Sequence, residues 1–204
     1  PLPLIQGPAS QLVRQTTDPK EKEDLQIINR NAQYLLSLVN QLIDLRKIDT
    51  QNLTLNYSQF NFSKFLNTTI TDFSNLMKER NISFEKIYRL KSDHIYSDKE
   101  NLHKILFNLL SNAIKHTPDK GKITLHANQF IDKSNKLMQF ISVTNSGSII
   151  APDEIDKIFN RFYRIPEQNK YTNYGQSSTG IGLHIVKELI NLLGGTIKVK
   201  SSEK

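Results

Sequence analysis

Four polar residues that recur at helical spacing are the first candidates for chemistry in this sequence. Two amide side chains one helical turn apart can supply oxygen ligands to a hard cation such as Mg²⁺, and a lysine beside them can meet phosphate charge. The alternative interpretation is a plain solvated helix face. The four residues stand at i, i+4, i+7 and i+8, on one face of a predicted helix: Asn108, Asn112, Lys115 and His116.

Two glycine-bearing segments follow this predicted helix. In residues 179–183, Thr-Gly-Ile-Gly-Leu, the glycines open a helix, so backbone N–H groups can approach a phosphate at its positive end. The segment is not a dinucleotide fingerprint, because it follows a polar loop where that motif needs a strand. Residues 143–148, Val-Thr-Asn-Ser-Gly-Ser, read as a strand that breaks into a turn and presents a side chain there.

The combination of these motifs resembles the sensor histidine kinases. Residues 108–115, 158–164 (Ile-Phe-Asn-Arg-Phe-Tyr-Arg) and 179–183 are similar, in order and spacing, to the asparagine box, phenylalanine box and second glycine box of that family. The first 50 residues resemble its dimerisation and phosphotransfer hairpin. Residues 31–47 are most similar to hybrid sensors, which carry a fused receiver domain.

The resemblance implies a Bergerat-type ATP-binding fold over residues 57–204, an α/β sandwich shared with Hsp90-type chaperones, type II topoisomerases and mismatch-repair ATPases. It implies ATP and Mg²⁺ as cofactors, with Asn112 as the Mg²⁺ ligand and Asn108 facing the phosphates beside it. Lys115 would touch phosphate. His116 would take the place where an aromatic residue usually packs on adenine.

The same resemblance assigns roles to the later boxes. Arg161 or Arg164 would stabilise the transferring phosphoryl group, under a lid of about residues 166–178. Such a site works by positioning and charge neutralisation, with little covalent chemistry asked of the protein. The residues expected to line the phosphates are Thr179, Gly180 and Gly182.

Two positions depart from the family's first glycine box, which runs Asp-x-Gly-x-Gly. The matching residues here are Asn145, Gly147 and Ile149. Asn145 can accept a hydrogen bond from the adenine amino group through its amide oxygen, but it lacks the charge that strengthens such a bond by about 1 kcal/mol or more. Ile149 adds a β-branched side chain where close approach is expected. Both departures predict weaker nucleotide binding.

The family's phosphoacceptor histidine is expected upstream of this sequence. In the family the acceptor precedes Glu-x-Arg-Thr-Pro-Leu or a close variant, and Pro1–Leu2 matches the end of that string. We therefore expect both ends to be cuts in a longer protein, with a strand truncated after Lys200. The histidines that are present all lie outside the hairpin: His94, His103, His116, His126 and His184.

Composition and charge exclude several other classes of protein. The 204 residues carry 27 Lys+Arg against 20 Asp+Glu, a formal charge of +7, and no cysteine, which excludes disulfides and thiolate chemistry. Basic residues are scattered among acidic ones, so a solvated basic surface is favoured over nucleic-acid binding. No apolar run reaches the roughly 18 residues of a membrane helix. With the resemblance, this predicts the cytoplasmic part of a membrane-anchored bacterial sensor.

An apolar repeat after Asp18 predicts a long helix with a coiled-coil seam. A second apolar stripe widens this face beyond what one partner helix could cover. With a shorter helix before it, residues 1–50 are predicted to form a helical hairpin that pairs with a second copy in a four-helix bundle. The alternative is a helical subdomain packed on its own chain. The seam residues are Leu25, Ile28, Ala32, Leu35, Val39 and Leu42.

The rest of the chain is predicted to be an α+β layer with helices on one face of a mixed sheet. Asp98 should cap the helix that carries the polar face. Strands are expected over about 53–60, 82–86, 123–128, 137–144 and 196–200, and helices over 62–77, 99–116 and 181–193, with a short helix beginning near 152.

The function predicted from this sequence is that of an ATP-dependent protein-histidine kinase of a two-component signal transduction system. It would autophosphorylate a histidine upstream of residue 1 and pass the phosphoryl group to a receiver aspartate. Expected partners are a second copy, a response-regulator receiver domain and an upstream sensor domain, without nucleic acid. The alternatives are a dimeric signalling module with a degenerate nucleotide site, another ATPase of the same fold, and a basic nucleic-acid-binding module.

Overall fold

The computed structural model describes residues 7–8, 11–13, 15–50, 52–133, 135–165 and 179–202 of the chain. The chain divides into two compact units, residues 1–53 and residues 54–204. The lid predicted over residues 166–178 lies outside the described residues. Within the described ranges, no helix is both long and apolar enough to cross a membrane.

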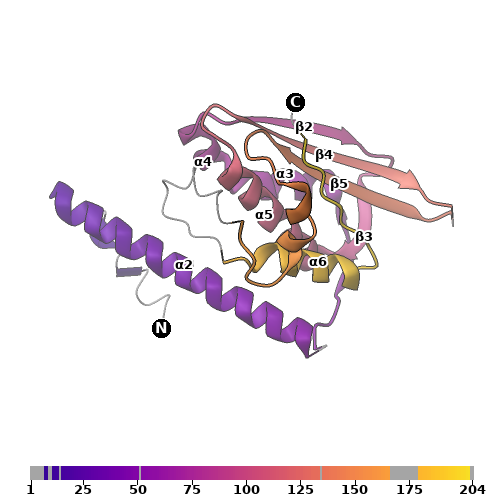
Figure 1. The fold of residues 1–204 in the computed structure, drawn as a ribbon, viewed down its shortest axis with the longest axis horizontal. Coiled ribbons are helices and arrows are strands. Elements are labelled where there is room, and N and C mark those ends of the chain that lie inside the picture. The colour runs from indigo at the N-terminus through magenta and orange to yellow at the C-terminus, as the bar shows by residue number, and fades with distance from the viewer. Residues whose placement is uncertain are drawn as a thin grey trace. The chain divides into compact units, whose positions relative to one another are not determined.

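The first unit is dominated by one long helix, α2 (Pro19–Asp49), which is drawn in purple in Figure 1. Asp18 caps it, since its side chain accepts a hydrogen bond from the backbone N–H of Lys20 at 2.8 Å, and Pro19 occupies the first helical position. The described residues 7–8, 11–13 and 15 are also helical. The long helix predicted from the apolar repeat is therefore present.

The apolar seam of α2 is largely uncovered in the single chain. Ala32 and Leu45 are buried, but Leu35 and Leu42 each leave 49% of their surface exposed. Exposed leucines one seam repeat apart are an apolar strip that a further helix could cover. The other large apolar side chains exposed along this helix are Ile27, Ile28, Val39 and Ile43.

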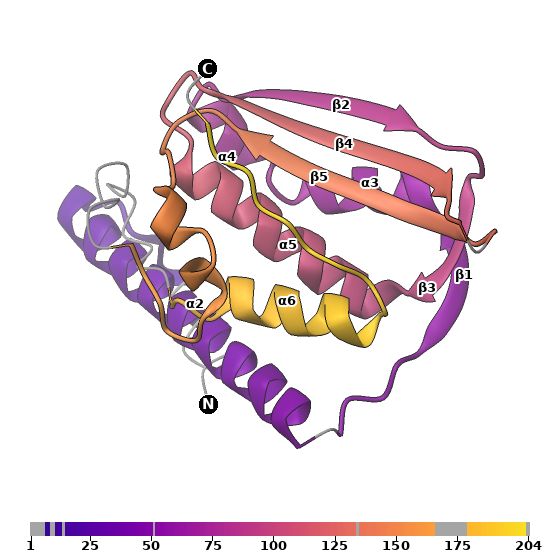
Figure 2. The same ribbon diagram turned by 45° about the vertical axis from the view of Figure 1, so that its right-hand side comes forward.

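The second unit contains two sheets. Strands β1 (Tyr57–Asn61) and β3 (His94–Asp98) pair antiparallel. In the three-stranded sheet, β2 (Ser83–Arg89) runs parallel to β4 (Lys122–Ile131), and β4 pairs antiparallel with β5 (Leu137–Asn145). The second unit therefore has the predicted mixed sheet in an α+β arrangement. Its helices α5 and α6 lie on one side of this sheet in both ribbon views (Figures 1 and 2).

The second unit also contains the helices α3 (Phe62–Thr71), α4 (Ser74–Glu79), α5 (Lys99–His116) and α6 (Gly182–Leu192). Two 3₁₀ turns lie before α6, η1 (Pro152–Glu154) and η2 (Lys157–Phe159). The bounds of α5 match the prediction. The prediction of one helix over 62–77 is wrong. The chain breaks between α3 and α4 at Phe73, which is buried with its ring centroid 4.8 Å from that of Phe107 on α5.

The strand predicted over residues 196–200 is also not formed. These residues alternate between exposed and half-buried side chains, as a strand would, and the segment passes near β5 in both ribbon views. A strand additionally needs a ladder of backbone hydrogen bonds to a neighbouring strand, and residues 196–200 of the described chain pair with neither sheet. One side-chain contact ties its end to the chain after β5, because Ser201 Oγ accepts from the backbone N–H of Ile150 at 2.9 Å.

The core lies between the three-stranded sheet and the helices. Alternate residues of β4 point into it and are fully buried, whereas the residues between them are not. Helix α5 contributes a matching apolar side, so the helix is fixed to the sheet by burial of large side chains. The largest fully buried apolar members on α3, α5 and β4 are Phe62, Leu66, Leu106, Leu110, Ile114, Ile123 and Leu125.

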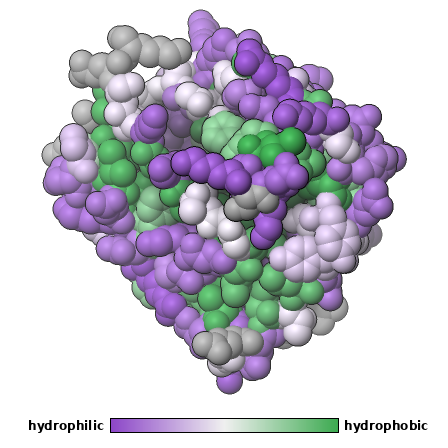
Figure 3. Space-filling model, turned by 90° about the vertical axis from the view of Figure 1, so that its right-hand side faces the viewer, coloured by the Kyte–Doolittle hydropathy of each residue, from purple (hydrophilic) through white to green (hydrophobic). Residues whose placement is uncertain are grey.

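Apolar side chains also reach the surface of this unit. In Figure 3, which shows the face at the right of Figure 1, hydrophobic residues in green interrupt the hydrophilic surface. Strands β4 and β5 leave large apolar side chains exposed where they approach their connecting turn. These side chains are Phe130, Ile131, Leu137 and Phe140.

Asp98 fixes the start of α5. It is buried, and its two carboxylate oxygens accept hydrogen bonds from the backbone N–H of Asn101 (2.9 Å), the Asn101 side chain (2.9 Å) and the backbone N–H of Asn56 (2.8 Å). Burial opposes the charged carboxylate, but these hydrogen bonds outweigh it and hold the pKa of Asp98 below its usual value of 3.8. Asp98 therefore links the segment before β1 to the start of α5.

We predict that Asp98→Ala lowers the free energy of unfolding of this unit by about 2 kcal/mol at pH 7, because three donors lose a charged acceptor. A carboxylate whose pKa is lower in the folded than in the unfolded chain stabilises the fold at any pH above the unfolded pKa. This stabilisation is lost as the pH falls through the folded pKa. Urea denaturation should show the difference shrinking below about pH 4. The neutral cap Asn61, which accepts from Lys64 N at 2.7 Å, is the control. Asn61→Ala should cost about 1 kcal/mol at either pH, and an equal pH dependence would contradict the assignment.

Candidate functional site

The predicted polar face of α5 is present and is half-buried. Asn108, Asn112, Lys115 and His116 each lie on this helix, and none of the four is fully exposed. Asn108 is held within its own helix, where Nδ2 donates to the carbonyl oxygen of Lys104 at 2.8 Å. A freely solvated helix face would leave such side chains exposed, so neighbouring segments must cover this one.

One of the covering segments is the start of α6. A Cβ added to Gly182 would lie 2.7 Å from Asn108 Oδ1, which is closer than side chains approach one another. Glycine at this position therefore allows α6 to begin directly against the amide of Asn108. The predicted second glycine box and asparagine box meet at this contact.

Gly180 brings the phenylalanine-box segment to the same place. Its φ is +69°, and a Cβ on it would lie 2.6 Å from the carbonyl carbon of Phe162. The backbone N–H of Phe162, itself at φ +62°, donates to the carbonyl oxygen of Gly180 at 2.9 Å. Thr179 Oγ1 accepts from the N–H of Ile181 at 3.1 Å. The backbone between Arg161 and Tyr163 is therefore attached to the residues that precede α6.

The first glycine box lies against the other end of α5. Gly147 has a φ of +131°, and a Cβ there would lie 2.5 Å from the carbonyl oxygen of His116. Asn145 is the last residue of β5, opposite Ile123 on β4, and its Nδ2 donates to the carbonyl oxygen of Ser146 at 3.4 Å. Ile149 is 47% exposed, so its side chain does not fill the core.

Positive charge is concentrated at the end of α5. Burial, followed by the charge of Arg164, lowers the pKa of Lys115 to about 8. Burial, followed by the charge of Lys115, also lowers the pKa of His116, which favours the neutral imidazole. The structure thus places Arg164 of the phenylalanine box near enough to Lys115 for their charges to interact. A ligand with negative charge would relieve that repulsion.

A carboxylate and a phenol hold the phenylalanine-box segment in shape. The hydroxyl of Tyr163 donates to Glu154 Oε2, and Lys157 Nζ lies 3.0 Å from Glu154 Oε1. These two hydrogen bonds, the one from Tyr163 first, lower the pKa of Glu154. The turn η1 is thereby tied to the residues on either side of Arg161.

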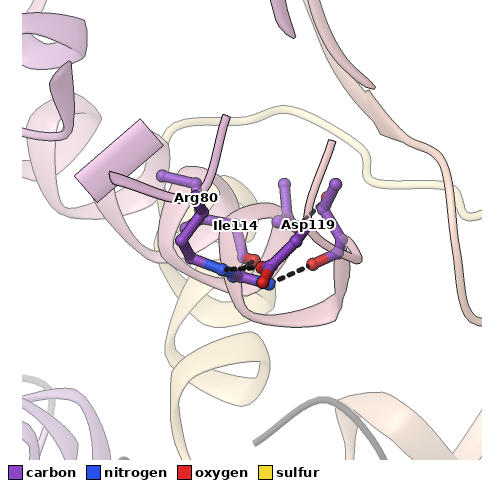
Figure 4. A network of polar contacts seen from close by, with 5 residues as sticks. Arg80, Ile114 and Asp119 are labelled. Atoms are coloured by element: carbon purple, nitrogen blue, oxygen red, sulfur yellow. Dashed lines mark hydrogen bonds and ion pairs between the residues drawn. The ribbon is translucent and has the colours of Figure 1, made fainter. Parts of the chain in front are cut away.

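Sequence reasoning missed Arg80, which closes the end of α5. Its side chain is only 5% exposed, and its guanidinium donates hydrogen bonds to the end of α5 and to the turn that follows it (Figure 4). Nη1 donates to the carbonyl oxygen of Ile114 at 2.6 Å, Nη2 to that of Thr117 at 2.6 Å, and Nε to Asp119 Oδ1 at 2.8 Å. The last carbonyls of a helix need such donors, and a cation is favoured there by the helix dipole. Arg80 therefore fixes the turn that carries Lys115 and His116.

The donor set of α5 fits a magnesium ion bound together with phosphate. Among the residues the structure describes, no group of three or more His, Cys, Asp or Glu side chains is arranged to hold a metal. Mg²⁺ is commonly bound through one or two protein oxygens, with substrate phosphates and water supplying the rest. The Asn112 side chain has no hydrogen-bond partner in the described part of the chain, so its amide oxygen is available to such an ion.

The low pKa of Lys115 gives a stability prediction. Because the pKa of Lys115 is lower in the folded than in the unfolded chain, its positive charge destabilises the folded state. This destabilisation is complete below about pH 8 and disappears as the pH rises toward the ordinary pKa of 10.5. Lys115→Met should therefore be more stable than the parent at pH 7, by about 1 kcal/mol after allowance for solvent screening.

Thermal unfolding at pH 7 and at pH 10 tests this prediction. The stability advantage of Lys115→Met should shrink at the higher pH, where the parent lysine is mostly neutral. The control is Lys99→Met at the exposed first residue of α5, which should change little at either pH. A loss of stability in Lys115→Met at pH 7 would contradict the prediction.

The geometry has its counterpart in known proteins. The family described as histidine kinase-, DNA gyrase B-, and HSP90-like ATPase matches residues 97–204. Histidine kinase P4 of Formosa agariphila is 35% identical over 208 residues, an alignment that covers 100% of this chain and 15% of that protein. Hybrid signal transduction histidine kinase D of Dictyostelium discoideum is 32% identical over 200 residues, covering 98% of this chain and 13% of that protein.

The fold is similar to that of a solved structure. Full-length ShkA in complex with AMPPNP superposes with a TM-score of 0.76 at 23% identity, over 99% of this chain and 40% of that one. At this identity the likeness concerns the fold. The chain spans less than one sixth of the length of the two curated relatives.

Proposed function

Because the chain belongs to the family of histidine kinase-, DNA gyrase B- and HSP90-like ATPases, we propose that it is the ATP-binding core of a two-component sensor histidine kinase. The observation that carries the proposal is the meeting of the three boxes around α5. Gly182 packs on Asn108, Gly147 packs on the end of α5, and Arg164 is close enough to Lys115 to lower its pKa. The names of the two curated relatives, both histidine kinases, support the same function.

The proposed roles follow from the chemistry of each side chain. The chemistry that Mg²⁺ would supply when bound is neutralisation of phosphate charge. Asn112 would hold the ion through its amide oxygen, and Asn108, fixed by its bond to Lys104, would lie beside the phosphates. Lys115 would contact phosphate, which would raise its pKa again by supplying the opposite charge.

The residues on either side of α5 complete the proposed site. Thr179, Gly180 and Gly182 would present backbone N–H groups to the phosphates at the start of α6. Arg161 or Arg164 would stabilise the charge on the transferring phosphoryl group. This assignment is supported by the attachment of their segment to Gly180.

The adenine end of the proposed site is formed by the first glycine box. His116, held neutral by burial, would pack on the base, since a neutral imidazole stacks without a charge to desolvate. Asn145 and Gly147 would lie at the base edge. Asn145 in place of Asp and Ile149 in place of Gly should weaken adenine binding. The histidine kinase relatives do not favour the alternative, a dimeric signalling module that binds nucleotide poorly.

We propose that the enzyme phosphorylates a histidine upstream of residue 1 and passes the phosphoryl group to a receiver aspartate. The partners would be a second copy of the chain, a response-regulator receiver domain and an upstream sensor domain. The hybrid kinase of Dictyostelium discoideum among the relatives supports a receiver partner, fused or separate. Placement in the cytoplasmic part of a membrane-anchored sensor stays a prediction.

Asn112→Ala tests the metal-phosphate assignment. Loss of an oxygen ligand should weaken binding of Mg·AMPPNP at least tenfold, about 1.4 kcal/mol, in calorimetric titration. With EDTA in place of Mg²⁺, parent and variant should bind the nucleotide equally, because the amide acts through the ion. The control is Ser111→Ala, at the neighbouring position on α5, which should bind like the parent. Equal affinity of Asn112→Ala and parent in Mg²⁺ would contradict the assignment.

The uncovered seam of α2 predicts a dimer with a helical interface. Leu35 and Leu42 are exposed one seam repeat apart, so charges at both positions would be buried unpaired in the proposed four-helix bundle. Sedimentation at micromolar concentration should show two chains for the parent and one for the Leu35→Glu, Leu42→Glu variant. The matched control is Gln33→Glu with Asn40→Glu, at exposed positions off the seam with the same spacing. A monomeric parent would refute the bundle.

A further inference from the structure

A histidine outside the three boxes contacts one of the proposed catalytic arginines. Nε of Arg161 donates to Nε2 of His184 at 2.8 Å, and Nδ1 of His184 lies 3.1 Å from the carbonyl oxygen of Phe159. A carbonyl oxygen only accepts hydrogen bonds, so Nδ1 must carry the proton in this arrangement. Nε2 is then the unprotonated nitrogen, which is the one that can accept from Arg161. One neutral tautomer satisfies both contacts.

Both ends of this chain of hydrogen bonds are anchored. His184 lies in the first turn of α6, next to Ile185, which is buried in the core. Phe159 is the last residue of η2 and is itself buried. The carbonyl oxygen of Phe159 and the imidazole of His184 are therefore held in place relative to each other, and their hydrogen bond fixes the orientation of the ring.

We propose that His184 is a positioning residue that sets the direction of the Arg161 guanidinium. An arginine that is exposed to solvent samples many rotamers, and only a fraction of them would face a phosphoryl group. A hydrogen bond at Nε fixes the plane of the guanidinium as well as its place, because the group is rigid and planar. The inference rests on the proposed function, in which Arg161 stabilises the transferring phosphoryl group.

Two other contacts hold the backbone of the same segment, which separates their role from that of His184. Phe162 N donates to Gly180 O, and Tyr163 donates to Glu154. Neither contact reaches the guanidinium of Arg161. Loss of the imidazole should therefore leave the segment in place and remove the hydrogen bond that fixes the guanidinium at Nε.

Autophosphorylation of the full-length protein at saturating Mg·ATP tests the proposal. His184→Ala should lower the rate about tenfold while the affinity for Mg·AMPPNP stays within about twofold of the parent. Arg161→Ala should lower the rate by at least as much, and the double variant should be no slower than Arg161→Ala, because both changes remove one unit. Lys187→Ala, on the same helix and beside Phe159, is the control and should keep the parental rate.

Two amide variants separate positioning from a merely structural role. Asn places its donor near the position of Nδ1, so His184→Asn keeps the bond to Phe159 but does not reach Arg161. Gln places an oxygen near the position of Nε2, so His184→Gln reaches Arg161. The proposal requires Gln to restore most of the rate and Asn to restore little. Restoration by Asn and not by Gln would overturn it.

The tautomer of His184 gives a readout that does not depend on catalysis. Long-range ¹H–¹⁵N correlation spectra of the chain should show His184 protonated at Nδ1, with Nε2 as the pyridine-type nitrogen. Arg161→Ala should move this signal toward a mixture of tautomers. An Nε2–H tautomer in the parent would overturn the proposed geometry.

Failure of the inference is distinguishable from failure of the proposed function. If Arg161→Ala is slow and His184→Ala is as fast as the parent, the positioning role is wrong and the kinase assignment stands. If the parent neither binds Mg·AMPPNP nor phosphorylates itself, the proposed function is wrong and the positioning role falls with it.

Discussion

The arrangement of the site depends on how closely α6 approaches α5 at Gly182. A single methyl group at that position would lie 2.7 Å from Asn108 Oδ1, so the amide of Asn108 could not keep its present place against the start of α6. Because α6 begins there, Gly180 lies two residues upstream and can bind the backbone of Phe162. Three segments that are distant in sequence are thus brought together by contacts that only residues without a side chain permit. The polar side chains of α5 are half-buried because these segments pack against the helix.

The same packing has an electrostatic cost. Lys115 and His116 are partly desolvated, and both lose proton affinity as a result, with Arg164 and Lys115 as the neighbouring positive charges. Arg80 lies at the end of the same helix, where carbonyl oxygens and Asp119 balance its charge. Within the described residues, no opposite charge or hydrogen bond counters the burial and the Arg164 charge that lower the pKa of Lys115. Uncompensated charge in a site is characteristic of groups whose partner is a ligand, and phosphate is the ligand that the family uses.

Hydrophobic periodicity was sufficient to predict the long helix α2 and the helix α5, and the resemblance of three motifs was sufficient to predict the family. The bounds of α5, its Asp98 cap and the mixed sheet follow from local patterns, and the family recognised from three boxes is confirmed by the match over residues 97–204. What could not be predicted depends on contacts between distant residues. Arg80 donates to carbonyl oxygens 34 and 37 positions away in the sequence, and the residues next to Arg80 in the sequence do not predict these contacts. At the break between α3 and α4, Phe73 packs against the ring of Phe107 on α5, a contact that the local pattern does not contain. The alternation of residues 196–200 did not produce a ladder. The glycine motifs could be recognised in the sequence, but the atoms that these glycines approach could not be predicted from it.

The parallel pairing of β2 with β4 has a consequence for how the molecule folds and opens. Residues paired across these strands are 39 positions apart, and α5 lies in the chain between them. Parallel strands need such a crossover connection, so the helix that bears the polar face is also the connection that closes the sheet. Long-range pairing of this kind forms late and opens as a unit. The amides of α5 should therefore exchange with solvent only through the global opening that also separates β2 from β4, and the site helix shares the cooperativity of the core.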